Sequence, residues 1–465
     1  MNAYNWRLVI AVGLGILLNP LNSSMVAVAL PRLQEDFRLD YTAVSWIIFS
    51  FYIASAIAQP VMGKASDLFG RRRIFIAGLI VSFVASLLAP LSLNFGWLIV
   101  FRIIQAIGTS MMVAVGMALV RIHITHRQAS ALSVISVFLS GAAAIGPFVG
   151  GALIQGWDWH AIFIVNIPFA AASLVLAWRT IPKDSFPSSD GDRLSMREWL
   201  AKIDAAGIVL FATGLIFLLI SLLNSGSSGS NLIRNVVFAL IGILLLVVFV
   251  RQELRSTSPF LPLRAFAKYP AMTRVNAEYM LINLLFYSIL FGFPSYLQSV
   301  RQVSEYDTGL LMLSLGLCSL VASPIAGRWI DKSGTRPALL LSALLMTLGS
   351  AWIVTLNESS PIIGVCIALA AFGISNGLVN VGMQAALFRS SPKEMIGVAS
   401  GLFSTSRYLG TILSSLLISN VMGGTFSFEG FRALGIILAV IALSLVFLNG
   451  RRRRLTSTFA YNEQA

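Results

Sequence analysis

Fourteen stretches of this chain are apolar for about twenty residues each, and short charged segments separate nearly all of them. A helix of about twenty residues spans the roughly 30 Å hydrocarbon core of a bilayer. A water-soluble domain cannot keep this pattern, because its helices need a polar face toward solvent. The sequence therefore predicts an all-α polytopic membrane protein with 14 transmembrane helices. The predicted spans are 7–30, 42–62, 74–92, 96–120, 129–153, 161–179, 205–223, 233–250, 271–296, 308–326, 338–356, 361–386, 396–421 and 431–449.

The net charge of +14 is distributed asymmetrically along the chain. With the amino terminus in the cytoplasm, the inner segments hold 25 of the 33 Lys and Arg residues, and the outer segments hold about five. This distribution predicts that both termini are cytoplasmic and that the chain is a multi-pass protein of the inner (cytoplasmic) membrane. The basic run at 451–454 is expected to touch anionic membrane lipids, and no nucleic acid is expected as a partner.

Two polar segments divide the chain. An extended cytoplasmic linker is predicted at 181–204 and a basic cytoplasmic connector at 251–270. They separate an N-terminal six-helix bundle (1–180), two additional transmembrane helices (205–250) and a C-terminal six-helix bundle (271–450), with a cytoplasmic tail at 451–465. Parallel repeats of a six-helix unit, with a binding site near the membrane midplane, are a known plan of transporters.

An internal repeat supports this 6 + 2 + 6 division. The sequence GKASDLFGRRR follows the second span, and GRWIDKSGTRP follows the tenth. Four positions match at a constant offset of 264 residues, pairing Gly63, Asp67, Gly70 and Arg72 with Gly327, Asp331, Gly334 and Arg336.

The first of these loops resembles the inner-loop motif of the major facilitator superfamily, although Ala65 and Ser66 replace the usual Leu and Ala. The resembling residues are Gly63, Asp67, Gly70, Arg71 and Arg72. Glycines at both ends permit a tight reversal between helices, and the carboxylate can accept hydrogen bonds from a neighbouring helix amino terminus. The arginines can pair with carboxylates or lipid phosphate. The resemblance implies a latch on an inner gate, and a loop that only sets topology is the alternative.

The stretch GAAAIGPFVGGAL in the fifth span resembles the exporter motif of the same family. Its glycines, Gly141, Gly146, Gly150 and Gly151, form a small-residue face that permits close helix contact. Pro147 removes one backbone hydrogen bond and can kink the helix. We expect this face to lie between the two halves, where a rocking motion would hinge. Ordinary small-residue packing is the alternative.

Two further stretches narrow the resemblance to the fourteen-span drug:proton antiporter branch. In the fourth span, Arg102, Gln105 and Gly108 resemble the R-x-x-Q-x-x-G motif, whose arginine is tied to proton transfer in the family. The stretch WDWHAIFIVNIP (157–168) is typical of the branch, and its tryptophans are expected to anchor the outer interface.

The first span departs from the branch. LNSSMVAVALP (21–31) resembles L-D-x-T-x-V-x-x-A-L-P, but Asn22 stands where the family has Asp. Because an amide carries no titratable proton, the chain must use another group for proton coupling or lack that coupling.

Glu278 is the acidic residue placed most clearly inside a span, and Arg102 and Arg407 are the other deep charges. Buried ionisable groups are costly and tend to be functional, so these three form the predicted intramembrane charge set for proton coupling. A structural ion pair of Glu278 with an arginine, or an interfacial position, is the alternative.

Polar and aromatic residues inside spans are candidates for the substrate cavity, because a polar stripe facing lipid would be unstable. Two of them, at 376 and 380, share one helix face with a third at 384. The candidates are Asn19, Asn22, Gln59, Gln105, Asn283, Tyr287, Asn376, Asn380 and Gln384.

These features predict a secondary transporter that exports amphipathic organic compounds by alternating access in exchange for protons, in the manner of multidrug efflux. Its partners would be a small-molecule substrate, protons and membrane lipids, and it would act as a monomer. No phosphate-binding loop pattern occurs, and the sequence indicates no catalytic residues, metal site or cofactor. An exporter of an anionic, zwitterionic or lipid-like metabolite, or a facilitator that needs no protons, is the alternative. An intramembrane enzyme or a transport-inactive sensor is more remote.

Overall fold

In the computed structural model, residues 3–124, 128–184, 204–224, 232–256, 259, 261, 263–356, 360–391, 396–422 and 426–450 are described, and every regular element among them is helical. The predicted all-α membrane fold is confirmed. Thirteen helices of this described part are long and apolar enough to cross a membrane. The predicted thirteenth span coincides with α18 (Ile396–Met422), which is not among them. That helix carries Arg407 and many Ser and Thr residues, which lower its mean hydropathy.

The N-terminal half begins with two helices in place of the single predicted span 7–30. A short interruption at Leu17 separates α1 from α2, and α2 continues through Pro31 to Asp36. The half contains α1 (Ala3–Ile16), α2 (Leu18–Asp36), α3 (Tyr41–Val44), α4 (Trp46–Phe69), α5 (Arg71–Leu88), a 3₁₀ turn η1 (Ala89–Leu91), α6 (Phe95–His123), α7 (Gln128–Trp157), α8 (Ala161–Ile164) and α9 (Asn166–Thr180).

The rest of the chain contains a helical hairpin and a second set of long helices. The hairpin is formed by α11 (Ala205–Asn224) and α12 (Leu232–Arg255), and α13 (Leu263–Lys268) is a short helix within the predicted connector. The second set is α14 (Pro270–Ser295) with its π-helical extension η2 (Tyr296–Val300), α15 (Glu305–Ser333), α16 (Thr335–Thr355), α17 (Ile362–Ser390), α18 and α19 (Phe428–Gly450). Residues 185–203, which make up most of the predicted linker at 181–204, lie outside the described residues, as does the tail at 451–465.

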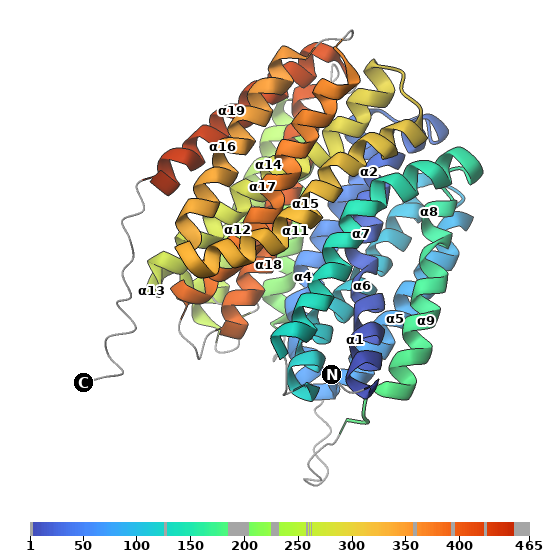
Figure 1. Cartoon of the computed structure of the whole chain (residues 1–465), viewed down its shortest axis with the longest axis vertical. Helices are drawn as coiled ribbons and strands as arrows, with labels where there is room; N and C mark the ends of the chain where they lie inside the picture. Colours follow the sequence, from blue (N-terminus) through green and yellow to red (C-terminus); the bar gives the residue numbers. More distant parts are fainter. Residues whose placement is uncertain are drawn as a thin grey trace.

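The two sets of helices stand side by side (Figure 1). Helices α1 to α9 form one bundle and α14 to α19 the other, with α7 packed on α15 and α4 packed on α18 where the bundles meet. The α11–α12 hairpin contacts α18 and α4 rather than inserting between the bundles. This arrangement places α2, α4, α7, α14, α15 and α18 along the boundary between the halves.

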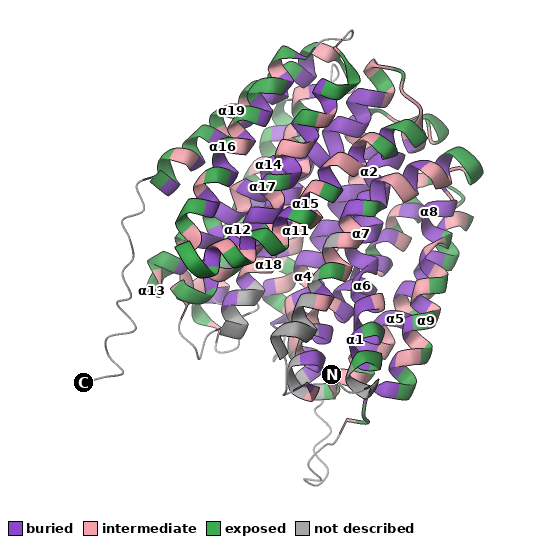
Figure 2. Cartoon of the chain, in the orientation of Figure 1, coloured by how far each residue is buried: buried purple, intermediate pink, exposed green. Residues whose placement is uncertain are grey.

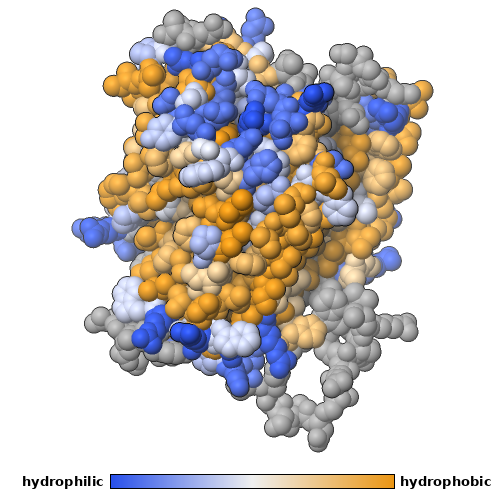
Figure 3. Space-filling view, turned by 90° about the vertical axis from the view of Figure 1, so that its right-hand side faces the viewer, coloured by the Kyte–Doolittle hydropathy of each residue, from blue (hydrophilic) through white to orange (hydrophobic). Residues whose placement is uncertain are grey.

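Burial follows the same arrangement. Buried residues concentrate where the helices pack on one another, and exposed residues cover the outer faces of the bundles (Figure 2). Large apolar side chains such as Leu240, Leu244 and Val440 are more than half exposed. On the face shown in Figure 3, hydrophobic side chains form a broad band, and hydrophilic side chains gather toward its two ends. This surface suits a bilayer, whose interior is apolar and whose two boundaries are polar.

Candidate functional site

Asn22 lies at the centre of a buried polar network in the N-terminal half. Its Oδ1 accepts hydrogen bonds from Gln105 Nε2 at 3.1 Å and from Asn166 Nδ2 at 2.8 Å. Its Nδ2 donates to the Leu18 carbonyl at 2.7 Å, and Gln105 Nε2 also donates to Ser86 Oγ at 3.0 Å. The network therefore joins α2, α5, α6 and α9, and it uses both the acceptor and the donor of the Asn22 amide.

Asn166 is a member of this network that the sequence analysis missed. The available signal was its place in WDWHAIFIVNIP, a stretch used above only to identify the branch. Besides Asn22, its Nδ2 donates to the carbonyls of Ile162 and Phe163 at 3.0 and 3.1 Å. Asn166 is fully buried, and these contacts satisfy its Nδ2, whereas its Oδ1 has no hydrogen-bond partner among the described residues.

Arg102 extends the network. Its side chain is 1% exposed, Nη1 donates to Gln105 Oε1 at 2.8 Å, and the guanidinium lies 4.3 Å from the centre of the Phe51 ring. Its Nε has no hydrogen-bond partner within the described residues. The charge is thus stabilised by an amide and an aromatic face, in keeping with the cost of a buried cation.

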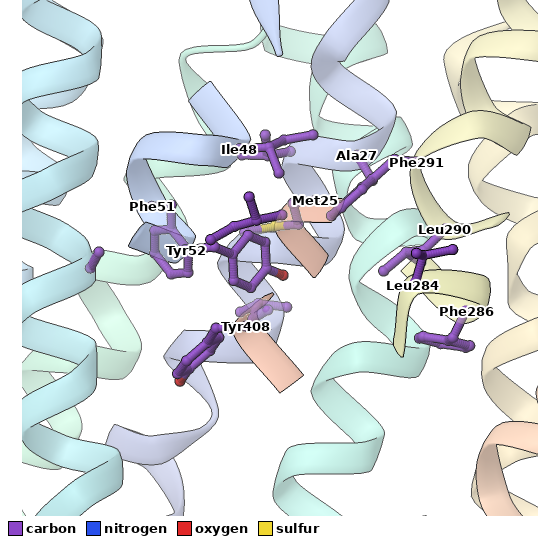
Figure 4. Packing of buried hydrophobic residues seen from close by; sticks show 14 of the residues in the cluster. Met25, Ala27, Ile48, Phe51, Tyr52, Leu284, Phe286, Leu290, Phe291 and Tyr408 are labelled. Atoms are coloured by element: carbon purple, nitrogen blue, oxygen red, sulfur yellow. The ribbon is translucent and has the colours of Figure 1, made fainter. Parts of the chain in front are cut away.

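A second cluster of buried and partly buried residues joins the two halves. The Tyr52 ring of α4 lies 5.7 Å from Tyr287 of α14 and 5.8 Å from Tyr408 of α18. Phe291 of α14 lies 6.4 Å from the same ring. Figure 4 shows Tyr52 between Phe51 on one side and Phe291 on the other, with Tyr408 nearby. We call Tyr52, Tyr287, Phe291 and Tyr408 the aromatic cluster.

Arg407 lies against this cluster. Its Nη2 donates to the Tyr408 hydroxyl at 3.1 Å, and its guanidinium lies 4.8 Å from the centre of the Tyr408 ring. Tyr279, which stacks on Phe403 at 3.7 Å, and Tyr287 are also among its electrostatic neighbours. The sequence analysis identified Arg407 and Tyr287, but not Tyr52 or Tyr408, because isolated tyrosines in apolar spans have no distinctive pattern.

Glu278 has a different environment. Its Oε1 lies 2.9 Å from Nε of Arg274, one turn earlier on α14, and its side chain is 2% exposed. Arg274 also donates to the Leu448 carbonyl at 2.6 Å, which ties α14 to α19. The structure therefore divides the predicted charge set. Glu278 belongs to an ion pair, whereas Arg102 and Arg407 contact amide, hydroxyl and aromatic groups.

The remaining cavity candidates differ in burial. Asn19 donates to Thr109 Oγ1 at 3.2 Å, Asn283 donates to the carbonyl of Tyr279 in its own helix at 2.7 Å, and Gln59 is buried. On α17, Asn376 donates to Ser319 of α15 at 3.0 Å, while Asn380 and Gln384 are exposed. The polar face of α17 therefore contacts α15 at Asn376. It becomes exposed at Asn380 and Gln384, toward the end of the helix that is predicted to be cytoplasmic.

The inner loop of the N-terminal half turns at Gly70, whose φ of +97° favours glycine. Asp184, which follows α9, accepts hydrogen bonds from the backbone N–H groups of Arg72 at 3.0 Å and Arg73 at 3.2 Å. Asp184 therefore caps α5, the role expected of a carboxylate in this loop. The side chain of Asp67, to which the sequence analysis gave that role, lies outside the described part of the chain.

Two expectations for this loop are corrected. Gly63 lies within α4 and does not form the turn, because the helix continues to Phe69. The Arg72 guanidinium donates to the Trp178 carbonyl at 2.8 Å instead of pairing with a carboxylate. Arg71 is the first residue of α5. Burial of His123, together with the positive charge of Arg71, holds the pKa of the His123 imidazole below its usual value.

The corresponding loop of the C-terminal half has the same construction. Gly334 has a φ of +80° between α15 and α16, and Gly327 lies inside α15 as Gly63 lies inside α4. Arg336 donates to the Gly450 carbonyl at the end of α19, much as Arg72 donates to a carbonyl near the end of α9. Asp331 is exposed. Each repeat arginine thus ties its loop to the last helix of its own half.

The glycines of the fifth span pack on two sides of α7. A Cβ added at Gly150 would lie 3.1 Å from Met25 Cα, and one at Gly146 would meet Ser24, so both contact α2 within the same half. Gly151 meets the Glu305 carbonyl of the opposite half. A Cβ added at Gly141 would meet no atom of the described residues within 4 Å beyond its own helix. The expectation of one face between the halves is therefore wrong for Gly146 and Gly150, and it stays a prediction for Gly141.

The opposite half supplies matching small residues. A Cβ added at Gly309 would lie 2.6 Å from the Pro147 carbonyl, and one at Gly316 would meet the backbone of Ala144. Along α7 and α15 the two backbones therefore approach as closely as helices can. This contact holds together the ends of the two halves that the sequence predicts to face outward, and we call them the outer ends.

A second set of contacts stabilises the outer end. Arg32 forms a two-point ion pair with Asp158, with Nε–Oδ1 at 2.9 Å and Nη2–Oδ2 at 3.0 Å. Trp159 is buried and its Nε1 donates to Asp36 at 2.8 Å. The expectation that the tryptophans of this stretch anchor the interface is therefore wrong for Trp159, while Trp157 is exposed.

The outer ends of the two halves also border a polar cavity of about 540 Å³. Gln298, at its edge, donates to the Val28 carbonyl across the halves at 3.1 Å. Further lining residues are Arg32, Glu35, Arg38, Gln302 and Glu305.

The chain forms two helical bundles around a polar and aromatic centre. Matched loops lie at one end of the bundles and tight packing lies at the other. This is the architecture of a membrane transporter. The chain belongs to the major facilitator superfamily, whose family model matches residues 12–415 and 279–460.

Three known proteins illustrate what the chain is similar to. It is 42% identical, over 92% of its length and 93% of the relative's, to the uncharacterised MFS-type transporter YwoD of Bacillus subtilis. It is 28% identical to the tetracenomycin C resistance and export protein of Streptomyces glaucescens, over 90% of this chain and 77% of that one. Its fold resembles the crystal structure of the nucleoside transporter NupG, with a TM-score of 0.67, 11% identity and coverage of 96% of this chain and 99% of that one.

Proposed function

We propose that this protein is a fourteen-helix secondary transporter of the cytoplasmic membrane that exports amphipathic organic compounds by alternating access. In this proposal the two bundles rock about their boundary, both termini face the cytoplasm, α11 and α12 are peripheral, and the monomer is the working unit. One observation supports this proposal most directly. An aromatic centre lies between the two bundles, and the backbones of α7 and α15 touch at the outer ends of those bundles.

The packing suggests how the cycle runs. The contact of Gly309 and Gly316 with α7 keeps the outer ends closed, so a compound from the cytoplasm would reach the aromatic cluster from the inner side. The exposed Asn380 and Gln384 would line that inner route. The loops at Gly70 and Gly334 would then close the inner side while α7 and α15 separate.

Export of organic compounds is also supported by a relative. The Streptomyces glaucescens protein is named for resistance to, and export of, tetracenomycin C, and the alignment spans most of both chains. We propose export for this chain as well. We also propose that it belongs to the fourteen-span antiporter branch, because of the motifs in its first, fourth and fifth spans.

Exchange for protons is part of the proposal, with Glu278 as its carboxyl. Among the described residues of α1–α9 and α14–α19, Glu278 is the one buried acidic side chain. Its partner Arg274 is 44% exposed, so water can reach the pair. A carboxyl that alternates between an arginine and a proton can couple proton release to movement of the helix that carries it.

A second candidate function follows from Asn22, Arg102 and Arg407. Without a carboxyl at position 22, the N-terminal network has no titratable acid, and the buried Arg102 and partly buried Arg407 favour an anionic or zwitterionic substrate. In this alternative the protein is an exporter of such a metabolite, or a facilitator that needs no protons.

The test is a susceptibility panel of cationic, neutral and anionic amphipathic compounds in an efflux-deficient bacterial host. Expression should raise tolerance to at least one compound and lower its accumulation, and a protonophore should abolish both effects. Tolerance that survives the protonophore would favour the proton-independent alternative. No change in accumulation of any compound, with the protein present in the membrane, would refute export.

A further inference from the structure

The aromatic cluster and Arg407 have the features of a binding site. Tyr52 comes from the N-terminal half, whereas Tyr287 and Tyr408 come from two helices of the other half. Three rings from three helices thus come together at the boundary that must open and close during transport, and Figure 4 shows two of them, Tyr52 and Tyr408. Aromatic rings bind other planar rings through stacked and edge-to-face contacts.

The charge at this site is positive. The electrostatic neighbours of Arg407 are the phenols of Tyr408, Tyr287 and Tyr279, which carry no charge near neutral pH. The nearest acidic residue along α14 is Glu278, and its carboxylate is 2.9 Å from Arg274. Within the described part of the chain, Arg407 therefore has neutral partners only.

The guanidinium also has unused hydrogen-bonding capacity. Nη2 donates to Tyr408, but the buried Nε has no partner among the described residues. A buried donor atom without a partner is costly, and an oxyanion can satisfy it. A guanidinium presents a planar fork of N–H groups that matches carboxylate, sulfonate or phosphate oxygens.

Arg102 adds a second positive charge beside the cluster. It lies over Phe51, whose ring is 5.4 Å from that of Tyr52. Rings alone would form a cage suited to a cation. Here the buried Arg102 and the partly buried Arg407 both lie beside the rings, so the local potential disfavours cations and favours anions.

We propose that the aromatic cluster and Arg407 form a binding site for an anionic aromatic compound. The ring system packs among Tyr52, Tyr287 and Tyr408, and the anionic group binds the Arg407 guanidinium. This inference rests on the proposed transport function and narrows its substrate class from amphipathic compounds in general to aromatic anions.

The test compares three probes that share one ring system and differ in charge. They are naphthalene-sulfonate, the neutral naphthalene-sulfonamide and the cationic naphthyl-trimethylammonium. Binding to the purified full-length protein is measured by calorimetry, and counterflow is measured in proteoliposomes. Since the sulfonate and ammonium groups do not titrate near neutral pH, the comparison is independent of proton coupling. We expect the sulfonate to bind about tenfold or more tightly than the cation.

Variants assign the effect to the site. Arg407→Gln should weaken sulfonate binding by about tenfold to a hundredfold and leave sulfonamide binding nearly unchanged. Arg432→Gln is the matched control, because Arg432 also lies over a ring, that of Phe428, but is exposed at the outer end of α19. Tyr287→Leu should weaken binding of the anionic and neutral probes alike, because it removes a ring contact and no charge.

Retained sulfonamide binding shows that Arg407→Gln remains folded. Equal sulfonate affinity in that variant and the wild type would overturn the assignment of Arg407. Preference for the cation, with counterflow of the cation only, would overturn the anionic substrate class but leave transport itself intact. If no probe bound and no compound of the susceptibility panel were exported, both the inference and the proposed function would fail.

Discussion

Asn22 Oδ1 accepts a hydrogen bond from Gln105 Nε2 at 3.1 Å, and this contact joins the first and fourth predicted spans inside the N-terminal bundle. Gln105 in turn accepts from Arg102 at 2.8 Å. The position that holds a carboxyl in the resembling branch is therefore occupied by an amide that is connected to a buried arginine. A change of charge at position 22 should therefore alter the electrostatic environment of Arg102 through Gln105.

The substitution Asn22→Asp should make transport depend more steeply on pH. A carboxylate can keep both hydrogen bonds that Oδ1 accepts, but only the protonated acid can donate to the Leu18 carbonyl, as Nδ2 does now at 2.7 Å. Each protonation state thus satisfies a different part of the network. The measurement is the initial rate of export in vesicles between about pH 6 and 8, a range that covers ordinary cytoplasmic conditions.

The control is Asn22→Ala, which removes the hydrogen bonds without adding a titratable group. It should lower thermal stability by about 1–3 kcal/mol, because Asn166 and Gln105 lose an acceptor. It should not steepen the pH profile. Identical pH profiles for wild type and Asn22→Asp would remove this position from proton coupling.

Glu278→Gln should abolish proton-driven export while the protein remains folded. The substitution removes the carboxyl proposed to exchange protons but retains the shape of the side chain, and Arg274 keeps its bond to the Leu448 carbonyl. The measurement is export driven by an imposed pH gradient in vesicles, with counterflow as a control that needs no gradient. If gradient-driven export persists, the ion pair with Arg274 is structural and Glu278 is not part of the coupling.

Gly316→Ala should favour opening of the outer side. Its new Cβ would meet the backbone of Ala144, which cannot move away without separating α7 from α15. Overpacking of this kind costs about 1–3 kcal/mol in the closed form. We expect faster labelling, by an impermeant thiol reagent, of a cysteine introduced by Met312→Cys in a background without Cys318 and Cys366, because Met312 is fully buried on α15 between Gly309 and Gly316.

Gly327→Ala on the same helix is the comparison for that experiment. Nothing lies within 4 Å of its added Cβ, so the substitution should contribute only a gain in helix propensity of up to about 1 kcal/mol. Labelling should then stay at the level of the parent. Equal labelling of both alanine variants would show that the α7–α15 contact does not limit opening.

Asp158→Asn should lower the free energy of unfolding at neutral pH by about 0.2–1 kcal/mol, because it removes the ion pair with Arg32. This is the range for partly exposed ion pairs. The hydrogen bond from Arg32 holds the pKa of the Asp158 carboxyl below its usual value. The pair therefore contributes above about pH 4, the usual value for an unfolded Asp, and is lost as pH falls further.

Asn is a suitable replacement at this position because Asp158 has a φ of +65°, which Asn tolerates better than most residues. Thermal unfolding at neutral pH and at about pH 3 would test the prediction, since the Asp carboxyl of the unfolded chain is largely protonated at the lower pH and the stabilising contribution of the pair is then reduced. The difference between wild type and variant should shrink at the lower pH. A constant difference would mean that the amide, and not the lost charge, causes the change.

Local sequence was sufficient for the helical class and for most helix positions. Apolar runs of membrane length gave spans that agree with α5, α9 and α16 within a few residues, because each such helix satisfies its own backbone. Helix ends near polar residues were less predictable. The first predicted span ended at residue 30, yet α2 continues to Asp36, since Pro31 is accommodated within the helix.

The sequence alone determined the membrane-spanning helices, the asymmetric distribution of positive charge, the repeated inner loops and the amide at position 22. The tertiary structure decided the partners: Glu278 with Arg274, Asp184 with the amino terminus of α5, Asn166 with Asn22, and Tyr52 with two helices of the other half. The physical reason is that hydropathy and spacing act within one helix. The contacts that define the site join residues that are often more than a hundred positions apart, and only the packing of whole helices brings them together.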